Sequence, residues 1–583
     1  MKYYLATTGI SEIWDLDKKL LLLGPWCLAD GKNKRLLENK NYTFVSSPWK
    51  PAIKIKEAAD YCYDIYERLF PQICENLNLI HQVSYPDRYW KILLEPWLFN
   101  FIVVFYDRYR RIEKALELFP DFYTNVLPIE QCRLLSFDTA DFAYGKINED
   151  YYNLKLFSLL SYDLCPNNII VKEYGHDSNI NIPSMKYSWK RKLYDKLIEL
   201  LDLFFKSPIV LCDMYHLTPY DMILLKIKTR FKTIGFTHLE SIKKSLPRDR
   251  YSNEIRDTIK LKGASDKFQS LLYKIVPEAI PVCYIENYKL YRDNIRNIKN
   301  RDPVKIVGSA VGWFINEEFK FFAAEAVSKG AKLIDFQHGG GYGTALVDLL
   351  ERLSLEKGSF YTWGWDLKSK NNIKPFPSPH LSKLRDTYLP RLDLILVVGV
   401  TVPRYSYILQ NMLFPDDMYN YFEHKRMFLQ ALSEDIRDKI LYKPYAEKYG
   451  WNELDIVKKA CPSARFILKG NLTRWMQKVK LVVIDHPHTS FIEALTINVP
   501  CVFYWDHEVY LMRPEAEGYF GLLRDAGILF KDPLSAAKKV KKISHNPMGW
   551  WSKNDVQKAR LEFCKKYAYA RKDWADVWAE EFK

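Results

Sequence analysis

Between two apolar runs near the end of the chain, the segment DHPHTSFIE concentrates polar side chains that can do chemistry. The run before it, Lys480–Ile484, is apolar and largely β-branched, as in a buried parallel strand, and the run after it, Val499–Trp505, resembles the next strand. Ser490 and Glu493 have the spacing of a capping box, in which each side chain bonds the backbone amide of the other residue. We therefore predict a strand, a short polar loop, a helix and a second strand.

This polar loop would lie where open α/β sheets bind ligands, at the carboxyl end of a strand and the amino end of a helix. The free amides of the first helical turn favour an anion there. A phosphate would accept hydrogen bonds from those amides, from the Thr489 and Ser490 hydroxyls and from His486, while Pro487 fixes the bend. Glu493, one turn into the helix, could instead accept from ribose hydroxyls. A simple helix cap beside surface histidines is the alternative explanation.

A second candidate is Lys443, which precedes Pro444 at the end of a predicted strand, Lys439–Tyr442. A lysine at this position would hold a point charge over the sheet edge, where it can meet a phosphate. An ordinary surface lysine explains the same pattern, because lysine is usually exposed.

The third candidate is His338, which follows a predicted strand, Lys332–Phe336, in the segment FQHGGGYG. At the mouth of a sheet, His338 could act as a general base or hold an oxyanion. Glycines let the backbone approach a ligand closely, so we expect the residues after it to contact substrate: Gly339, Gly340, Gly341 and Tyr342. The segment matches neither a dinucleotide fingerprint nor a P-loop, and a tight turn with a structural histidine remains the alternative.

The sequence predicts no cofactor and no metal site. His486 and His488 could begin a metal site, but a third ligand is lacking nearby and His507 lies in a different loop. Asp15 and Asp17 resemble a carboxylate pair for a metal nucleotide, yet they lie in a polar segment where a helix would start. The chain also lacks the G-x-S-x-G motif of serine hydrolases.

The elements that must position these residues form two α/β halves. Residues 1–370 would be the N-terminal half, with an α-helical insertion at about 56–130, where apolar residues recur at helical spacing. Within it, residues 130–300 mix strands with basic amphipathic helices, of which Trp189–Phe205 is the clearest. The proline-containing segment 371–390 would link this half to a nucleotide-binding half, residues 391–583. The expected class is α/β, with two Rossmann-like domains that face a cleft.

Composition limits the function. The chain has 583 residues, 48% of them hydrophobic and 15% aromatic, which excludes a disordered protein. Its net charge of +15 favours an anionic partner: nucleic acid, an anionic membrane surface or a phosphorylated substrate. Ten cysteines without a C-x-x-C pair, and a first segment without the apolar core of a signal peptide, favour a cytoplasmic protein. We expect it at most at the inner face of the membrane, peripherally.

Several segments carry a resemblance to known families. DHPHTS with Glu493 is similar to the His-Pro and Ser/Thr motifs of bacterial CMP-sugar transferases, and Lys443 is similar to basic nucleotide-site positions of capsule and teichoic-acid transferases. The whole chain resembles a family of transferases from O-antigen and other surface-carbohydrate loci. The segments that carry this likeness are LATTGISEIWD, LGPWC, RYWKILLEPWL, FQHGGGYG, TWGW and DHPHTSFIEAL.

The resemblance implies a GT-B glycosyltransferase, in which residues 1–370 would bind the acceptor and residues 391–583 the nucleotide sugar. It would move a sugar, CMP-activated and acidic (of the Kdo or nonulosonate type), to a surface glycan or lipid-linked acceptor, without an obligatory metal. His338 would be the catalytic residue, and the nucleotide would be held by Lys443, His486, Pro487, Thr489, Ser490 and Glu493. A CDP-alditol phosphotransferase is the alternative enzyme.

A non-enzymatic protein that binds nucleic acid or a membrane surface is the alternative class. The lysines of Lys538–Lys542 lie near Trp550 and Trp551, and such a basic and aromatic surface could bind either. Because acidic residues are interspersed with most other basic segments, we do not expect nucleic acid as a partner.

Overall fold

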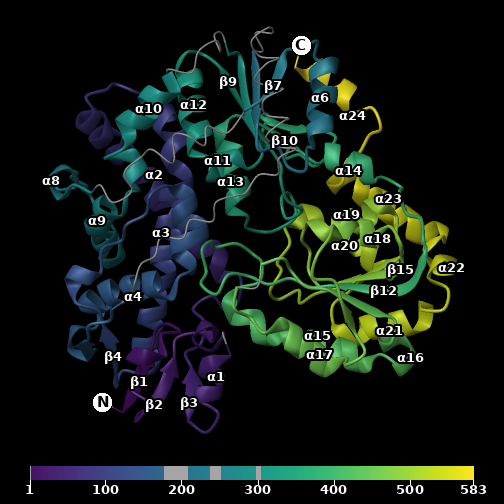
Figure 1. Ribbon diagram of the computed structural model, residues 1–583, viewed down its shortest axis with the longest axis horizontal. Helices are drawn as coiled ribbons and strands as arrows, with labels where there is room; N and C mark the ends of the chain where they lie inside the picture. Colours follow the sequence, from purple (N-terminus) through teal and green to yellow (C-terminus); the bar gives the residue numbers. More distant parts are fainter. Residues whose placement is uncertain are drawn as a thin grey trace.

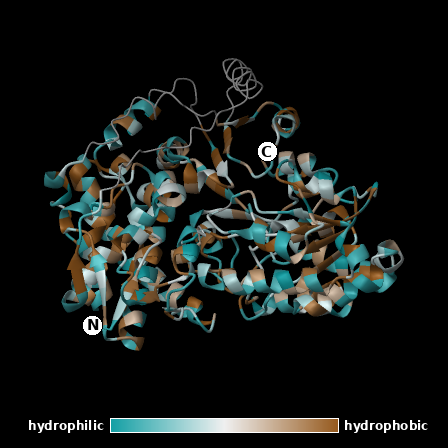
Figure 2. Cartoon of the chain, turned by 60° about the horizontal axis from the view of Figure 1, so that its bottom comes forward, coloured by the Kyte–Doolittle hydropathy of each residue, from teal (hydrophilic) through white to brown (hydrophobic). Residues whose placement is uncertain are grey.

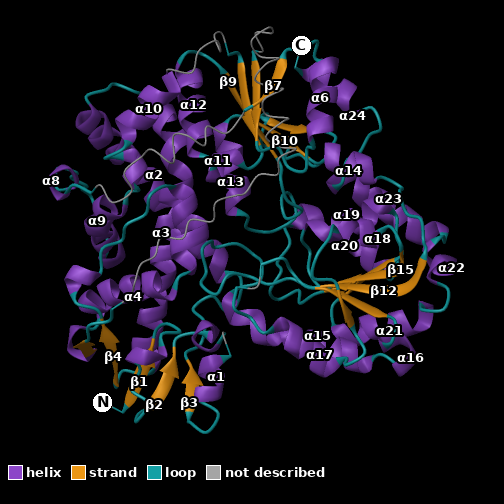
Figure 3. Ribbon diagram, in the orientation of Figure 1, coloured by secondary structure: helices purple, strands orange, loops and turns teal. Residues whose placement is uncertain are grey.

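The computed structural model describes residues 2–29, 31–175, 208–236, 251–296, 304–447 and 449–582. In this part of the chain the strands form three parallel sheets, each flanked by helices (Figures 1 and 3). Figure 2 shows that the strands are largely hydrophobic, whereas the surrounding helices alternate hydrophobic and hydrophilic residues. The helix expected over Trp189–Phe205 lies outside the described residues.

The first sheet has five strands in the order β3-β2-β1-β4-β5. Two long helices, α2 (Lys54–His81) and α3 (Asp87–Leu118), leave it after β3 and return to it at β4. They bury one large core of aromatic and aliphatic side chains, which accounts for much of the aromatic content of the chain. The strands are β1 (Tyr3–Ala6), β2 (Lys19–Leu22), β3 (Tyr42–Phe44), β4 (Phe122–Val126) and β5 (Ile169–Val171).

The second sheet has six strands in the order β11-β10-β9-β8-β6-β7. Helix α12 (Glu317–Ser328) connects β8 to β9 and packs on α3, and α13 (Leu349–Lys357) connects β9 to β10. The chain order changes direction between β6 and β8, and such a switch point is where α/β sheets bind ligands. The strands are β6 (Ile209–Cys212), β7 (Thr233–Gly235), β8 (Ile306–Ser309), β9 (Lys332–Phe336), β10 (Ser359–Thr362) and β11 (Ile373–Pro375).

The third sheet has the order β14-β13-β12-β15-β16-β17, which is the order of a dinucleotide-binding Rossmann sheet. Its switch point lies between β12 and β15. The strands are β12 (Leu392–Val398), β13 (Ile440–Lys443), β14 (Arg465–Phe466), β15 (Val479–Ile484), β16 (Cys501–Tyr504) and β17 (Leu529–Phe530). The helices around it include α15 (Met418–Ala431), α17 (Glu453–Ala460), α19 (Thr489–Ile497), α20 (Pro514–Asp525), α21 (Pro533–Ile543) and α23 (Asn554–Tyr567).

The second and third sheets confirm the predicted fold class, a GT-B-like pair of Rossmann-like domains with a helical insertion in the N-terminal half. The separate first sheet was not predicted, because its short strands are widely spaced along the chain. The expected linker segment, 371–390, holds β11 and the helix α14 (Pro379–Leu384).

The last helix of the chain, α24 (Trp574–Glu581), packs against α6 (Pro219–Lys228) beside the second sheet (Figure 1). Trp578 stacks on Phe336 with ring centroids 4.9 Å apart. The chain therefore crosses from the third sheet back to the second, and buried tryptophan side chains hold this crossing. None of the described helices combines the length and the apolar character that a bilayer span requires.

Candidate active site

A cavity of about 660 Å³ lies between the second and third sheets, and loops from both sheets line it. The segments that follow β6 and β9 contribute from one side, and those that follow β12, β13 and β15 contribute from the other. Because parallel strands end at the same edge of a sheet, these loops are the carboxyl ends at which α/β sheets bind ligands. The segments after β12 and β15 flank the switch point of the third sheet.

The predicted phosphate loop lines the cavity on the side of the third sheet, but the prediction of a capping box is wrong. Helix α19 begins one residue after its N-cap, His488, so Ser490 is already in the first helical turn. The Ser490 hydroxyl bonds His486, and the Glu493 carboxylate bonds His380. The spacing of Ser490 and Glu493 fits a capping box, but both side chains bond residues outside the predicted box.

Asp485, His486 and Ser490 form a continuous hydrogen-bonded chain. His486 Nδ1 lies 3.1 Å from Asp485 Oδ1, and His486 Nε2 lies 2.9 Å from Ser490 Oγ. An ionised carboxylate only accepts hydrogen bonds, so we assign the ring proton to Nδ1. Nε2 then accepts from the Ser490 hydroxyl. The imidazole is thus held in one tautomer, with its lone pair toward the start of α19.

A buried lysine compensates the charge of Asp485. Lys425 Nζ, on α15, lies 2.8 Å from Asp485 Oδ2, and both side chains are almost fully buried. Tyr421 donates to the other oxygen at 2.8 Å. Burial raises the pKa of Asp485, but Lys425 and His486 outweigh it and lower the pKa to about 2. Asp485 is therefore a fixed anion behind His486.

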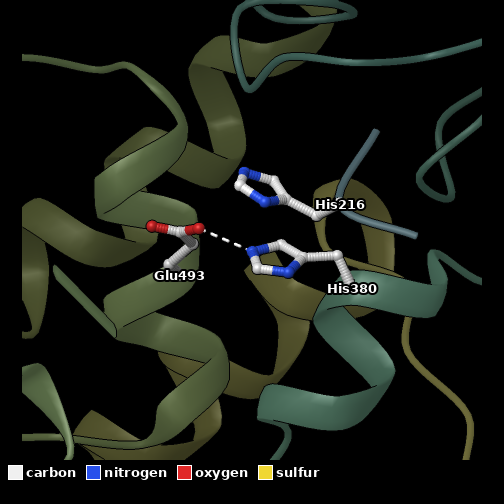
Figure 4. Close-up of side chains that lie close together, drawn as sticks. All are labelled: His216, His380 and Glu493. Atoms are coloured by element: carbon white, nitrogen blue, oxygen red, sulfur yellow. Dashed lines mark hydrogen bonds and ion pairs between the residues drawn. The ribbon is translucent and has the colours of Figure 1, made fainter. Parts of the chain in front are cut away.

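Glu493 faces two histidines that the sequence analysis did not identify (Figure 4). His380 Nε2, on α14, lies 2.6 Å from Glu493 Oε1. The ring of His216, in the loop after β6, stacks on that of His380 at 4.3 Å. Among the described residues, these three side chains form the group that could hold a metal ion. His216 and His380 come from separate segments and belong to no motif, so sequence spacing could not indicate them.

His338 lies on the opposite wall and is half-buried there. Burial lowers its pKa to about 4, although a hydrogen bond to the Ala310 carbonyl opposes the shift. Tyr342 OH lies 3.1 Å from His338 Nδ1, and the ring of Phe314 is 5.7 Å away. The imidazole is neutral near pH 7. The ring nitrogen without a proton faces the Tyr342 hydroxyl. A substrate hydroxyl must replace Tyr342 at this nitrogen before His338 can accept a proton from it.

Of the four residues after His338 that were predicted to contact substrate, Gly339 lines the cavity, whereas Gly340, Gly341 and Tyr342 do not. Gly340 N donates to Thr489 Oγ1 at 3.1 Å, and a Cβ at Gly340 would lie 3.0 Å from the Thr489 backbone. The close approach is therefore to helix α19, across the boundary between the two sheets.

The remaining nucleotide-side residues lie as follows. Lys443, at the end of β13, lines the cavity and makes no ion pair with any residue that the structure describes. His488 also lines it, and its buried Nε2 has no hydrogen-bond partner in the part of the chain that the structure describes. Pro487 is buried in the loop beneath them. Five tyrosines complete the wall: Tyr215, Tyr405, Tyr407, Tyr445 and Tyr449.

The basic surface near the C-terminus does not offer stacking platforms. Trp550 and Trp551 are 9% and 1% exposed, and Lys539 Nζ lies 4.0 Å from the centre of the Trp550 ring. Aromatic binding of nucleic-acid bases requires exposed rings. This geometry disfavours the alternative of a nucleic-acid-binding protein.

Comparisons with known proteins agree with a transferase. A family model described as LIC12162 family transferase matches residues 3–582. None of the curated protein sequences matches the chain.

The chain also has remote similarity to solved structures, among them these three. CalG4, the calicheamicin glycosyltransferase, has 10% identity and a TM-score of 0.32 and covers 65% of this chain and 98% of its own. Acinetobacter baumannii MurG has 10% identity and a TM-score of 0.30, with coverage of 64% and 98%. Anabaena HepE in complex with UDP has 12% identity and a TM-score of 0.33, again with coverage of 64% and 98%.

Proposed function

Because this chain belongs to the LIC12162 family of transferases, we propose that it moves a sugar from a nucleotide donor to a glycan or lipid-linked acceptor. The observation that supports this most is one cavity with two different walls. A helix amino end at a Rossmann switch point forms one wall, and a neutral histidine forms the other. The first suits a phosphate, and the second suits the hydroxyl of an acceptor.

On the donor side, the nucleotide phosphate would lie at the start of α19. The free amides of the first turn, the Thr489 hydroxyl and Lys443 would contact its oxygens. In the structure the Ser490 hydroxyl donates to His486 Nε2. When the phosphate binds, it would accept this hydrogen bond instead of His486. A protonated His486, held from behind by Asp485, would then donate to the phosphate as well.

Glu493 would receive the ribose. A carboxylate accepts hydrogen bonds from both hydroxyls of a vicinal diol, and Glu493 lies one turn into the helix that holds the phosphate. His380 bonds one carboxylate oxygen at 2.6 Å and leaves the other for the ribose. We infer a CMP-activated acidic sugar, of the Kdo or nonulosonate type, because DHPHTS resembles the motif of transferases that use such donors.

On the acceptor side, we propose that His338 takes the proton of the attacking hydroxyl. Its lowered pKa keeps the imidazole neutral at pH 7, so a nitrogen lone pair is present without prior deprotonation. The acceptor hydroxyl would displace Tyr342 from Nδ1. As the bond from the sugar to the donor phosphate breaks, the positive groups around α19 stabilise the leaving phosphate. We place this reaction at the inner face of the membrane.

A nucleotide screen by thermal unfolding tests the donor. We expect CMP and CDP to raise the melting temperature, because a ligand at 100 times its Kd stabilises the folded state by about 2.7 kcal/mol. UDP, GDP and NAD should have no effect. Measurements in buffer with EDTA exclude metal-dependent effects. Equal or larger stabilisation by UDP would overturn the CMP assignment, and products that carry a transferred alditol phosphate would favour the phosphotransferase.

A further inference from the structure

Three potential metal ligands meet at the edge of the cavity, from three separate segments. His216 follows β6 of the second sheet, His380 lies at the start of α14, and Glu493 lies in α19 beside the third sheet. One ligand atom of each lies within 4.8 Å of the other two. Figure 4 shows the two imidazoles side by side and the carboxylate directed at His380.

The chemistry of this set favours a transition metal over Mg²⁺ or Ca²⁺. Two imidazole nitrogens and one carboxylate oxygen are the ligands of many open Zn²⁺ sites, whereas Mg²⁺ and Ca²⁺ prefer oxygen ligands only. All three residues line the cavity, so a fourth position would be open to water or to a substrate group.

The distances require only small movements. His380 Nε2 and Glu493 Oε1 are 2.6 Å apart, closer than two ligands of one ion, because a hydrogen bond joins them. Bonds of about 2.0–2.1 Å in a tetrahedral site place ligand atoms roughly 3.3 Å apart. His380 and Glu493 must therefore separate slightly, and His216 must approach. His216 is exposed, so its ring has room to rotate from the stack on His380.

The lysine beside His216 does not oppose an ion here. Lys383 Nζ lies 3.3 Å from the backbone oxygen of His216, but it also pairs with Asp221 Oδ2 at 2.5 Å. The lysine charge is thus largely compensated by a buried carboxylate. Glu493 has no such cation among the described residues, and its hydrogen-bond partner is His380.

We propose that His216, His380 and Glu493 bind one divalent transition-metal ion, for which Zn²⁺ is the best match, and that this ion joins the two six-stranded units across the cavity. The ion would take the carboxylate that the ribose needs. If Glu493 holds the ribose, which rests on the proposed function, then Zn²⁺ and nucleotide compete.

Isothermal titration of the full chain, first stripped with EDTA, tests the site. We expect one Zn²⁺ per chain, no comparable binding of Mg²⁺, and at least tenfold weaker Zn²⁺ binding in His216→Ala and in His380→Ala. His216 is exposed, so its variant should fold normally, and circular dichroism would check this. His545→Ala is the matched control, because His545 is an exposed histidine far along the chain from the site.

The outcomes separate clearly. Unchanged Zn²⁺ affinity in His216→Ala, absence of Zn²⁺ binding by the wild-type chain, or an equal loss in His545→Ala would each overturn the metal site. Nucleotide binding in EDTA tests the proposed function separately, since it requires no ion. Zn²⁺ binding that CMP leaves unchanged would preserve the site and remove the competition.

Discussion

The two walls of the cavity each present a histidine just beyond the end of a parallel strand, yet they treat it differently. His486 is backed by Asp485, and Lys425 compensates that carboxylate from below. His338 has a tyrosine hydroxyl and a backbone carbonyl as partners and an aromatic ring nearby. Burial lowers the pKa of both histidines, but the carboxylate of Asp485 opposes this shift at His486, whereas a backbone carbonyl opposes it at His338. An anion favours the positively charged imidazole more strongly than a neutral carbonyl does. The same residue type thus suits phosphate binding on one wall and proton acceptance on the other.

The largest expected effect is on turnover. His338→Ala should lower kcat by about 10²- to 10⁴-fold, the usual contribution of a general base, and leave CMP affinity unchanged. His486→Ala should instead weaken nucleotide binding. It should raise the Kd for CMP about 10- to 100-fold, because a hydrogen bond to a charged group contributes about 1.5–3 kcal/mol. Steady-state kinetics and titration calorimetry on both variants measure this. Normal turnover of His338→Ala would make FQHGGGYG a structural turn.

The next effect concerns the stability of the donor wall. Lys425→Met should destabilise the fold by about 3–5 kcal/mol, because it leaves Asp485 as a buried charge without its cation. Lys439→Met is the matched control: its partner Asp393 is exposed, and such pairs contribute about 0–1 kcal/mol. Urea unfolding at pH 7 measures both. Equal losses in the two variants would contradict the role of Lys425.

The pH dependence of that stability follows from Asp485. Its folded pKa, about 2, lies below the usual unfolded value near 3.9, so its contribution is present above pH 4 and is lost as the pH falls toward 2. Lys425→Met should reduce this acid-dependent loss.

The smallest effect is a proton uptake on binding. Burial lowers the pKa of His486 in the free protein, and a phosphate beside it would raise the pKa. Binding should therefore take up a proton, and CMP affinity should fall as the pH rises from 7 to 9, by at most about tenfold per pH unit. Asp485 stays ionised and His488, with a pKa of about 3, stays neutral in this range. The control is the same pH series of CMP affinity measured on His486→Ala. If His486 is the titrating group, the affinity of this variant should not change with pH. A variant with the same slope as the wild-type chain would exclude His486.

Local sequence patterns predicted the strand-loop-helix around His486 and the strand before His338. Apolar runs and helical spacing report burial on a sheet, and the carboxyl end of a strand follows from the chain direction. Both loops line the cavity. These patterns did not predict the first sheet. Its strands of three to five residues are too short to show a clear pattern, and β1 pairs with β4, which lies more than a hundred residues away in the sequence.

What the sequence by itself determined is therefore the class of the fold and the segments that form the cavity walls. Only the tertiary structure decided the partners of each side chain. The spacing predicted that Ser490 and Glu493 form a capping box, but the helix starts earlier, after His488, and these side chains bond His486 and His380 instead. Likewise, Lys425 and Asp485 are 60 positions apart, and burial brings them together because neither charge is stable there alone. Hydrogen bonds and ion pairs depend on distances in space, which local periodicity does not encode.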